Sequence, residues 1–164
     1  MNTFRANASN IIETHLKISK VMDGDSIKVI SLFNKTEKEI RLYGLDAPET
    51  KFNRKLKEDE KKTQIAGKFL IHLGMQSLKF VLKVAPPETN ITLITEVNNF
   101  FDFYGRQLAY VLLPDGTCLN ELLIKEGFAK AFDEYACEEL ANYQKLNFSA
   151  MQERRGLYAQ CSKF

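Results

Sequence analysis

Residues 21–50 read VMDGDSIKVISLFNKTEKEIRLYGLDAPET. This stretch carries two acidic clusters, Asp-Gly-Asp at 23–25 and Asp-Ala-Pro-Glu at 46–49, and two short apolar runs that alternate with polar residues. Alternation with a period of two is typical of half-buried strands, so the two runs predict a hairpin. Such a hairpin would bring both clusters to one edge of a sheet, next to Arg41. Carboxylates gathered beside an arginine indicate a metal ion and an anionic substrate.

The elements outside this stretch are predicted from hydrophobic period and from turn residues. Three strands at 14–22, 27–32 and 39–45 are expected to form an antiparallel meander, because turn-forming residues separate them. The later elements are a helix at 59–72 that stops at Gly74, strands at 78–82 and 91–95, an apolar return at 108–113, and helices at 121–126 and 135–151.

These elements predict an α+β protein. Five short strands with a helix after the third are the arrangement of the oligonucleotide/oligosaccharide-binding (OB) fold, in which a small sheet closes to remove its edges. We therefore predict a five-stranded antiparallel OB-fold β-barrel with about three α-helices. No repeat or linker divides the sequence, so residues 14–160 are expected to form one domain after a flexible, polar N-terminus at 1–13.

Composition excludes several classes of protein. The chain has 164 residues and a formal net charge of +2, which suits one soluble domain and does not by itself indicate a nucleic-acid binder. Its three cysteines and two histidines lack the spacing of a zinc site. No apolar run is long enough for a membrane span, so no membrane association is expected. No secretory signal is visible, so the chain as written would be cytoplasmic; it would be secreted or periplasmic if a signal had been removed.

Three acidic residues are the candidates for a metal site. Asp25, Asp46 and Glu49 offer hard oxygen ligands, which suit Ca²⁺ or Mg²⁺ better than zinc. Ca²⁺ also accepts backbone carbonyls at irregular geometry, and the Asp-Ala-Pro turn offers the carbonyl of Ala47. Glu49 is in addition a candidate to orient or deprotonate a water molecule. Asp23 precedes a glycine and is interpreted as a turn residue.

Two arginines are candidates to bind the anion. Arg41 lies in a half-buried strand, where its side chain must either reach solvent or meet an anion. Arg106 follows a Tyr-Gly turn, a position that solvent-exposed arginines also occupy. A phosphodiester substrate would engage both residues, because guanidinium groups match phosphate oxygens and the transition state gains negative charge. The basic stretch at 51–62 is interpreted as a loop that enters a helix and attracts a phosphate backbone.

Taken together, five segments resemble the staphylococcal nuclease (thermonuclease) family. None is decisive alone, but all five occur in the family's order, and the match runs from about residue 15 to residue 158. The segments are VMDGDSIKV (21–29), IRLYGLDAPET (40–50), DFYGRQLAY (102–110), LNELLIKEGFAK (119–130) and ERRGLY (153–158).

The resemblance implies a fold, an activity and a set of site residues. It implies an OB-fold barrel with three helices and a phosphodiesterase of low sequence specificity that uses one Ca²⁺ ion and leaves 5′-hydroxyl and 3′-phosphate ends. The partners would be DNA and RNA, preferably single-stranded, and the protein would act as a monomer. The implied roles are Ca²⁺ ligation by Asp25, Asp46 and the carbonyl of Ala47, phosphate binding by Arg41 and Arg106, base catalysis or water positioning by Glu49, and a substrate contact by Tyr104.

The sequence departs from the family pattern at several positions. Ala47 replaces a threonine, and Phe103 replaces a lysine, so a charged contact to a terminal phosphate has no counterpart there. Phe132 and Tyr135 flank the place expected for a base-stacking tyrosine, and the segment at 85–99 is longer. The alternative function is a catalytically inactive member that binds nucleic acid or protein, but such modules typically lack some of the acids and arginines retained here. A generic single-strand binder of the same fold would not need the acidic pair.

Overall fold

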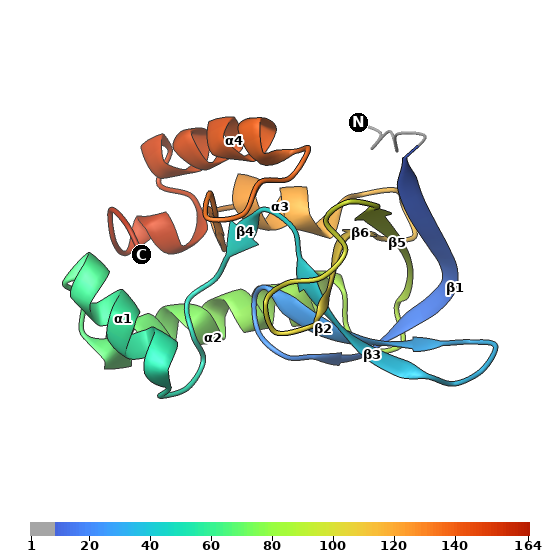
Figure 1. Ribbon diagram of the computed structural model, residues 1–164. Helices are drawn as coiled ribbons and strands as arrows, with labels where there is room; N and C mark the ends of the chain where they lie inside the picture. Colours follow the sequence, from blue (N-terminus) through green and yellow to red (C-terminus); the bar gives the residue numbers. More distant parts are fainter. Residues whose placement is uncertain (1–8) are drawn as a thin grey trace.

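The computed structural model describes residues 9–164, which form a β-barrel with most of the helices gathered to one side of it (Figure 1). Five strands close the barrel in the order β1-β2-β3-β6-β5. These strands are β1 Asn10–Val21, β2 Ser26–Ser31, β3 Glu37–Leu42, β5 Asn90–Glu96 and β6 Gln107–Leu112. A separate antiparallel pair consists of β4 Leu45–Asp46 and β7 Lys130–Ala131. The helices are α1 Arg54–Thr63, α2 Gly67–Val84, α3 Leu119–Lys125, α4 Leu140–Gln152 and the 3-10 helix η1 Gly156–Ala159.

The predicted meander at the start of the chain is confirmed. β1 pairs with β2 and β2 with β3, in both cases antiparallel. The first strand starts earlier than predicted, because Asn10 already pairs with Glu96 of β5. Residues 10–13 of the predicted flexible N-terminus therefore belong to the barrel, and positions 1–8 lie outside the described residues.

The prediction of a wholly antiparallel barrel is wrong in one pairing. β3 and β6 run parallel, whereas the other four neighbouring pairs are antiparallel. Parity explains this result: strand directions cannot alternate all the way around a closed ring with an odd number of members. A closed barrel of five strands must therefore contain at least one parallel pair, and the pair here joins the strands that carry Arg41 and the residues after Arg106.

The predicted strand at 78–82 is also wrong, because this segment is the last part of helix α2. Leu78, Phe80 and Leu82 recur at every second position, with Lys79 and Lys83 beside them, which imitates the period of a strand although Val81 is also apolar. The buried positions of α2 are instead spaced as on one helix face, namely Gly67, Leu70, Leu73, Gly74, Ser77 and Val81. The barrel still has five strands because β5 and its apolar return, β6, are two separate members.

Gly74 has a packing role rather than the predicted role of a helix stop. It lies in the middle of α2, where a Cβ atom would be only 2.6 Å from the carbonyl oxygen of Pro48. Glycine therefore lets the helix backbone touch the chain that follows β4. Gly24 serves the same contact, since a Cβ there would lie 2.7 Å from the Cβ atoms of both Ala47 and Ser77.

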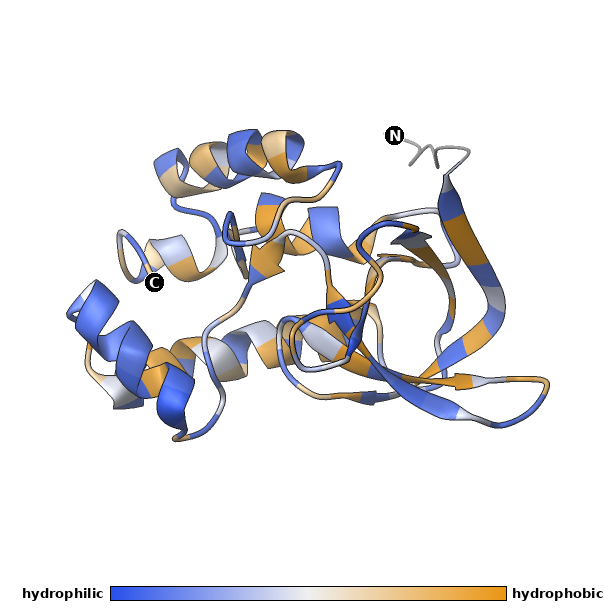
Figure 2. Cartoon of the chain, in the orientation of Figure 1, coloured by the Kyte–Doolittle hydropathy of each residue, from blue (hydrophilic) through white to orange (hydrophobic). Residues whose placement is uncertain are grey.

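Two apolar clusters stabilise this arrangement. The larger cluster fills the barrel and extends to α3, with members such as Ile18, Val29 and Leu93 fully buried. The smaller cluster joins α1 and α2 to the C-terminal segments through Leu56, Leu70, Leu73, Ala150, Leu157, Tyr158 and Phe164. Helix α1 is mostly hydrophilic in Figure 2, and only Leu56 and Thr63 of its residues are buried. Residues 9–164 contain four α-helices and one 3-10 helix, close to the expected number of about three α-helices.

No single helix within residues 9–164 is long and apolar enough to cross a membrane. Only α1 and α2 taken together have the required length and composition, and a bend of 108° separates them.

Candidate active site

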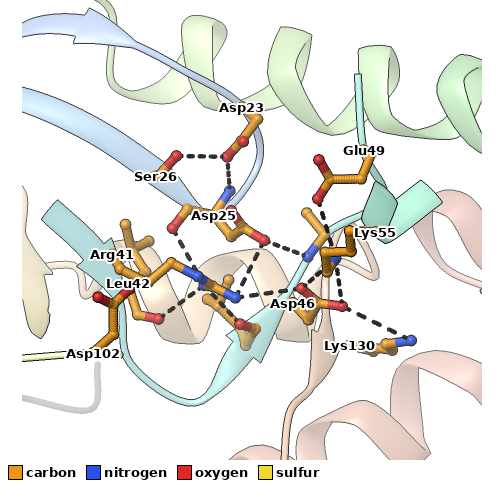
Figure 3. A network of polar contacts seen from close by, with 12 residues as sticks. Asp23, Asp25, Ser26, Arg41, Leu42, Asp46, Glu49, Lys55, Asp102 and Lys130 are labelled. Atoms are coloured by element: carbon orange, nitrogen blue, oxygen red, sulfur yellow. Dashed lines mark hydrogen bonds and ion pairs between the residues drawn. The ribbon is translucent and has the colours of Figure 1, made fainter. Parts of the chain in front are cut away.

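The β2–β3 hairpin builds the first side of the candidate site. Ser26 lies opposite Arg41 in the antiparallel ladder, so Asp25 is placed next to the arginine. The guanidinium contacts both acidic clusters, with Nη2 3.4 Å from Asp25 Oδ2 and 3.3 Å from Asp46 Oδ1 (Figure 3). The predicted meeting of the two clusters beside Arg41 is confirmed.

Backbone carbonyls hold Arg41 in addition to the carboxylates. Its Nη1 donates to the carbonyl oxygens of Leu45 at 2.9 Å and Leu42 at 3.2 Å. The side chain is only 12% exposed. Arg41 is therefore part of the packed floor of the site, with its orientation set by several partners at once.

The two aspartates of the first cluster have different roles. Asp23 Oδ1 accepts hydrogen bonds from the Asp25 N–H at 3.0 Å and from Ser26 Oγ at 2.9 Å, as expected for a turn residue. Asp25 Oδ2 accepts from the N–H of Ala47 at 3.0 Å. Burial raises the pKa of Asp25 to about 6, against the opposing effect of the Arg41 charge. Additional positive charge at this carboxyl would favour its ionised form.

Glu49 is held on both of its carboxylate oxygens. Oε2 accepts from Asn53 Nδ2 at 2.5 Å, and Oε1 lies 3.2 Å from Lys55 Nζ. The side chain is 16% exposed, and its backbone rests against Gly74 of helix α2. The carboxylate therefore has a defined orientation, which is what a group that positions water requires.

Asn53 and Lys55 are site residues that the sequence analysis did not identify. Asn53 caps helix α1, because its Oδ1 accepts from the N–H of Leu56 at 2.8 Å while its amide group binds Glu49. Lys55 Nζ lies 2.9 Å from Asp46 Oδ1. Asparagine before a helical stretch is an N-cap signal that would have placed the start of α1 correctly. Nothing in the local sequence indicates that Lys55 points toward the acids.

The parallel pairing of β3 and β6 brings Arg106 to the same site. Ile40 lies opposite Gln107 and Arg41 opposite Leu108, so Arg106 is next to Glu39. Arg106 Nη1 is 3.4 Å from Glu39 Oε1. Residues two apart on a strand share a face, so this register places the two arginines on the same side of the sheet.

Asp102, which the sequence analysis also missed, organises the turn that carries Arg106. Its Oδ2 accepts from Arg106 Nε at 2.7 Å, and its Oδ1 accepts from the N–H groups of Tyr104 and Arg106, each at 2.9 Å. The guanidinium carbon lies 5.7 Å from the centre of the Tyr104 ring. An aspartate that precedes a tight Tyr-Gly turn is the sequence signal for such capping of backbone N–H groups.

A cleft of about 1090 Å³ joins these groups. Six of the seven predicted site residues line it: Asp25, Arg41, Asp46, Glu49, Tyr104 and Arg106. Ala47 is the exception, because it is 2% exposed and lies behind the lining residues. The cleft therefore gathers the predicted anion-binding and acidic groups into one open space.

Aromatic side chains border the cleft on the side of Arg106. Phe103 and Tyr104 are each 85% exposed. Tyr135 lies between two other rings, with centroid distances of 5.5 Å to Phe103 and 5.7 Å to Phe132. The residues that flank the expected base-stacking position therefore belong to one aromatic group, to which Phe103 also contributes.

Resident cations contact the acidic groups of the cleft. Within residues 9–164, no three acidic, histidine or cysteine side chains converge closely enough to hold a metal ion by themselves. Asp25 and Asp46 share the Arg41 guanidinium, whereas Asp46 and Glu49 share the Lys55 ammonium. The donor set consists of hard carboxylate oxygens, the type of ligand that Ca²⁺ and Mg²⁺ prefer, and these oxygens already lie against positive charges.

Comparison with known proteins agrees with this arrangement. An uncharacterized endonuclease of Escherichia coli O157:H7 is 27% identical over 148 residues, which cover 90% of this chain and 78% of that protein. Endonuclease YhcR of Bacillus subtilis (strain 168) is 27% identical over 144 residues, which cover 86% of this chain and 11% of that protein. The model of the staphylococcal nuclease homologues matches residues 39–160, which include most of β3, all of β5 and β6 and every helix of the described residues, but neither β1 nor β2. The chain therefore belongs to the staphylococcal nuclease family.

Proposed function

We propose that the protein is a Ca²⁺-dependent nuclease that hydrolyses phosphodiester bonds of DNA and RNA with low sequence specificity. The observation that carries this proposal is the convergence of three acids and two arginines on one cleft. The two relatives described above bear the name endonuclease, which supports the same class of reaction.

The acidic side of the cleft suits a divalent cation. Asp25 and Asp46 offer carboxylate oxygens, and the Lys55 ammonium beside Asp46 marks a place where positive charge is stable. Ca²⁺ bound by these two residues, with the carbonyl of Ala47 as a further ligand, would polarise a phosphoryl oxygen of the substrate. Protein side chains would carry out the remaining steps of the reaction.

Glu49 is the residue that we expect to position and deprotonate the attacking water molecule. Its carboxylate lines the cleft and is oriented by Asn53, so it would accept a proton from a water molecule. The water oxygen forms a bond to phosphorus, and the bond from phosphorus to the 5′ oxygen breaks. That oxygen takes up a proton from solvent, which leaves a 5′-hydroxyl on one product and a 3′-phosphate on the other.

The two arginines would stabilise the phosphate as its negative charge increases. Arg106 is the more exposed of the two, at 28% against 12% for Arg41, and is therefore the more accessible to a substrate. Paired guanidinium donors in a cleft are an effective means of stabilising such charge. The exposed rings of Phe103 and Tyr104 suit unpaired bases, which supports a preference for single strands.

The test is cleavage of a single-stranded DNA oligonucleotide and of its RNA counterpart, with Ca²⁺ and then with excess chelator. Cleavage that requires Ca²⁺ and leaves a 3′-phosphate is expected. Glu49→Gln should lower kcat by about 10²- to 10⁴-fold while the circular dichroism spectrum stays unchanged. Binding of the oligonucleotide without hydrolysis in Ca²⁺ would overturn the proposal and favour the inactive binding module.

A further inference from the structure

Lys55 contacts three acidic side chains of the cleft. Its Nζ lies 2.9 Å from Asp46 Oδ1, 3.2 Å from Glu49 Oε1 and 3.5 Å from Asp59 Oδ2. Figure 3 shows the ammonium between the carboxylates of Asp46 and Glu49. Asp46 is thus bracketed by two cations, Arg41 and Lys55, with Lys130 Nζ at 4.0 Å as a third.

The position of helix α1 places the Lys55 ammonium close to the acidic side chains. Lys55 lies in the first turn of α1, whose start is set by the Asn53 cap and whose packing is set by the fully buried Leu56. The helix therefore holds the backbone of Lys55 in place. The side chain is still 38% exposed, and its flexible stem lets the ammonium turn out to solvent while α1 stays packed.

The contacts of Lys55 overlap with the predicted cation ligands. Asp46 is an expected metal ligand, and Glu49 is the expected water-positioning group. A divalent ion bound to Asp46 would lie within a few ångströms of an ammonium that kept both contacts. Two positive charges that close repel strongly in a partly buried site. The repulsion therefore opposes binding of the ion while the ammonium keeps both contacts.

We propose that Lys55 is a built-in counter-ion that competes with the divalent cation for Asp46 and Glu49, and thereby sets the affinity of the site. The inference rests on the proposed Ca²⁺ dependence. Without the ion, Lys55 neutralises carboxylates that are 5% and 16% exposed and stabilises the fold. When the ion binds, the ammonium leaves, and part of the binding energy is used to break its contacts.

The experiment measures cation binding directly, with no nucleic acid present. Isothermal titration gives the Kd for Ca²⁺ of the wild-type protein and of Lys55→Gln, and calorimetry gives the Tm of each without metal. Lys55→Gln should bind Ca²⁺ about tenfold more tightly, which corresponds to about 1.4 kcal/mol. The same variant should have a lower Tm without metal, and Ca²⁺ should raise its Tm more than that of the wild type.

Two control variants separate the charge of Lys55 from other effects. Lys57→Gln removes a charge from an exposed position of the same helix and should leave both the Kd and the metal-free Tm unchanged. Lys55→Arg keeps the positive charge and should bind Ca²⁺ as weakly as the wild type. Tight binding by Lys55→Arg would show that the charge is not the cause and would overturn the inference.

The outcomes distinguish this inference from the proposed function. Ca²⁺ binding by the wild type with an unchanged or higher Kd in Lys55→Gln would overturn the competition alone. Absence of Ca²⁺ binding in the wild type and in Lys55→Gln would overturn both. A lower Kd in Lys55→Gln, with Lys57→Gln unchanged, would establish Lys55 as the competitor.

Discussion

The two arginines of the cleft lie in contrasting surroundings. Arg41 is 12% exposed and binds two carboxylates and several carbonyl oxygens within the β2–β3 hairpin and the chain after it. Arg106 is 28% exposed, lies at the end of a turn and depends mainly on Asp102 and Glu39. The first arginine is a structural member of the barrel that also faces the cleft. The second is presented to the cleft by a turn that the barrel only supports.

Because of this difference, substitutions of the two arginines should affect stability and activity to different extents. Removing one partner of a buried ion pair leaves a buried charge without compensation, whereas an ion pair that solvent reaches contributes little. Substitution of Arg41 should therefore lower both the free energy of unfolding and the catalytic rate. Substitution of Arg106 should lower the catalytic rate with little change in the free energy of unfolding.

The largest effect is expected for Arg41→Ala. The substitution leaves Asp25 and Asp46, whose side chains are 9% and 5% exposed, without their shared guanidinium. We expect a loss of about 3–5 kcal/mol in the free energy of unfolding, measured by urea denaturation. Arg54→Ala, which changes an arginine that is 94% exposed, serves as the control and should unfold like the wild type. Equal stabilities of the two variants would contradict the structural role of Arg41.

Arg106→Ala is expected to lower activity far more than stability, unlike Arg41→Ala. We expect kcat to fall about 10³-fold, because a donor to the developing phosphate charge is lost. Asp102 keeps its two backbone N–H donors, so the free energy of unfolding should fall by only about 1 kcal/mol. Steady-state kinetics and urea denaturation of the same preparation test both statements. A kcat within tenfold of the wild type would remove Arg106 from the mechanism.

Asn53 allows the orientation of Glu49 to be tested apart from helix stability. Asn53→Asp keeps an oxygen that accepts from the Leu56 N–H but replaces the amide donor to Glu49 by a negative charge. We expect kcat to fall about 10- to 100-fold, as for other groups that orient a functional side chain, with no change in Tm. Asn53→Ser, which also caps the helix and lacks the charge, should be less impaired. Full activity in Asn53→Asp would show that Glu49 needs no such support.

The smallest effect is expected at the aromatic border. Phe103→Ala removes an exposed ring that lies 5.5 Å from Tyr135, and it should raise KM for a single-stranded oligonucleotide about tenfold while kcat stays the same. Phe33→Ala is the control, because Phe33 is similarly exposed at 77% and is not part of the cleft. A KM that changes equally in both variants would exclude a stacking role for Phe103.

The hairpin side of the site could be predicted because its contacts are local. The period of the strands and the length of the turn set the register that pairs Ser26 with Arg41, and this register brings Asp25 beside the arginine. The strand error at 78–82 has an equally local origin. Over so few residues, the spacing of Leu78, Phe80 and Leu82 matches the period of a strand, whereas the segment in fact continues a helix.

The sequence by itself thus determined the antiparallel meander of β1, β2 and β3 and the group formed by Asp25, Arg41 and Asp46, since neighbouring strands and short turns decide them. Only the tertiary structure decided which groups complete the cleft. Arg106 arrives through the parallel pair that closes a five-membered ring, and Lys55 arrives because Leu56 anchors α1 in a distant apolar cluster. Barrel closure and helix packing depend on contacts between segments far apart in the chain, and no local period encodes where they meet.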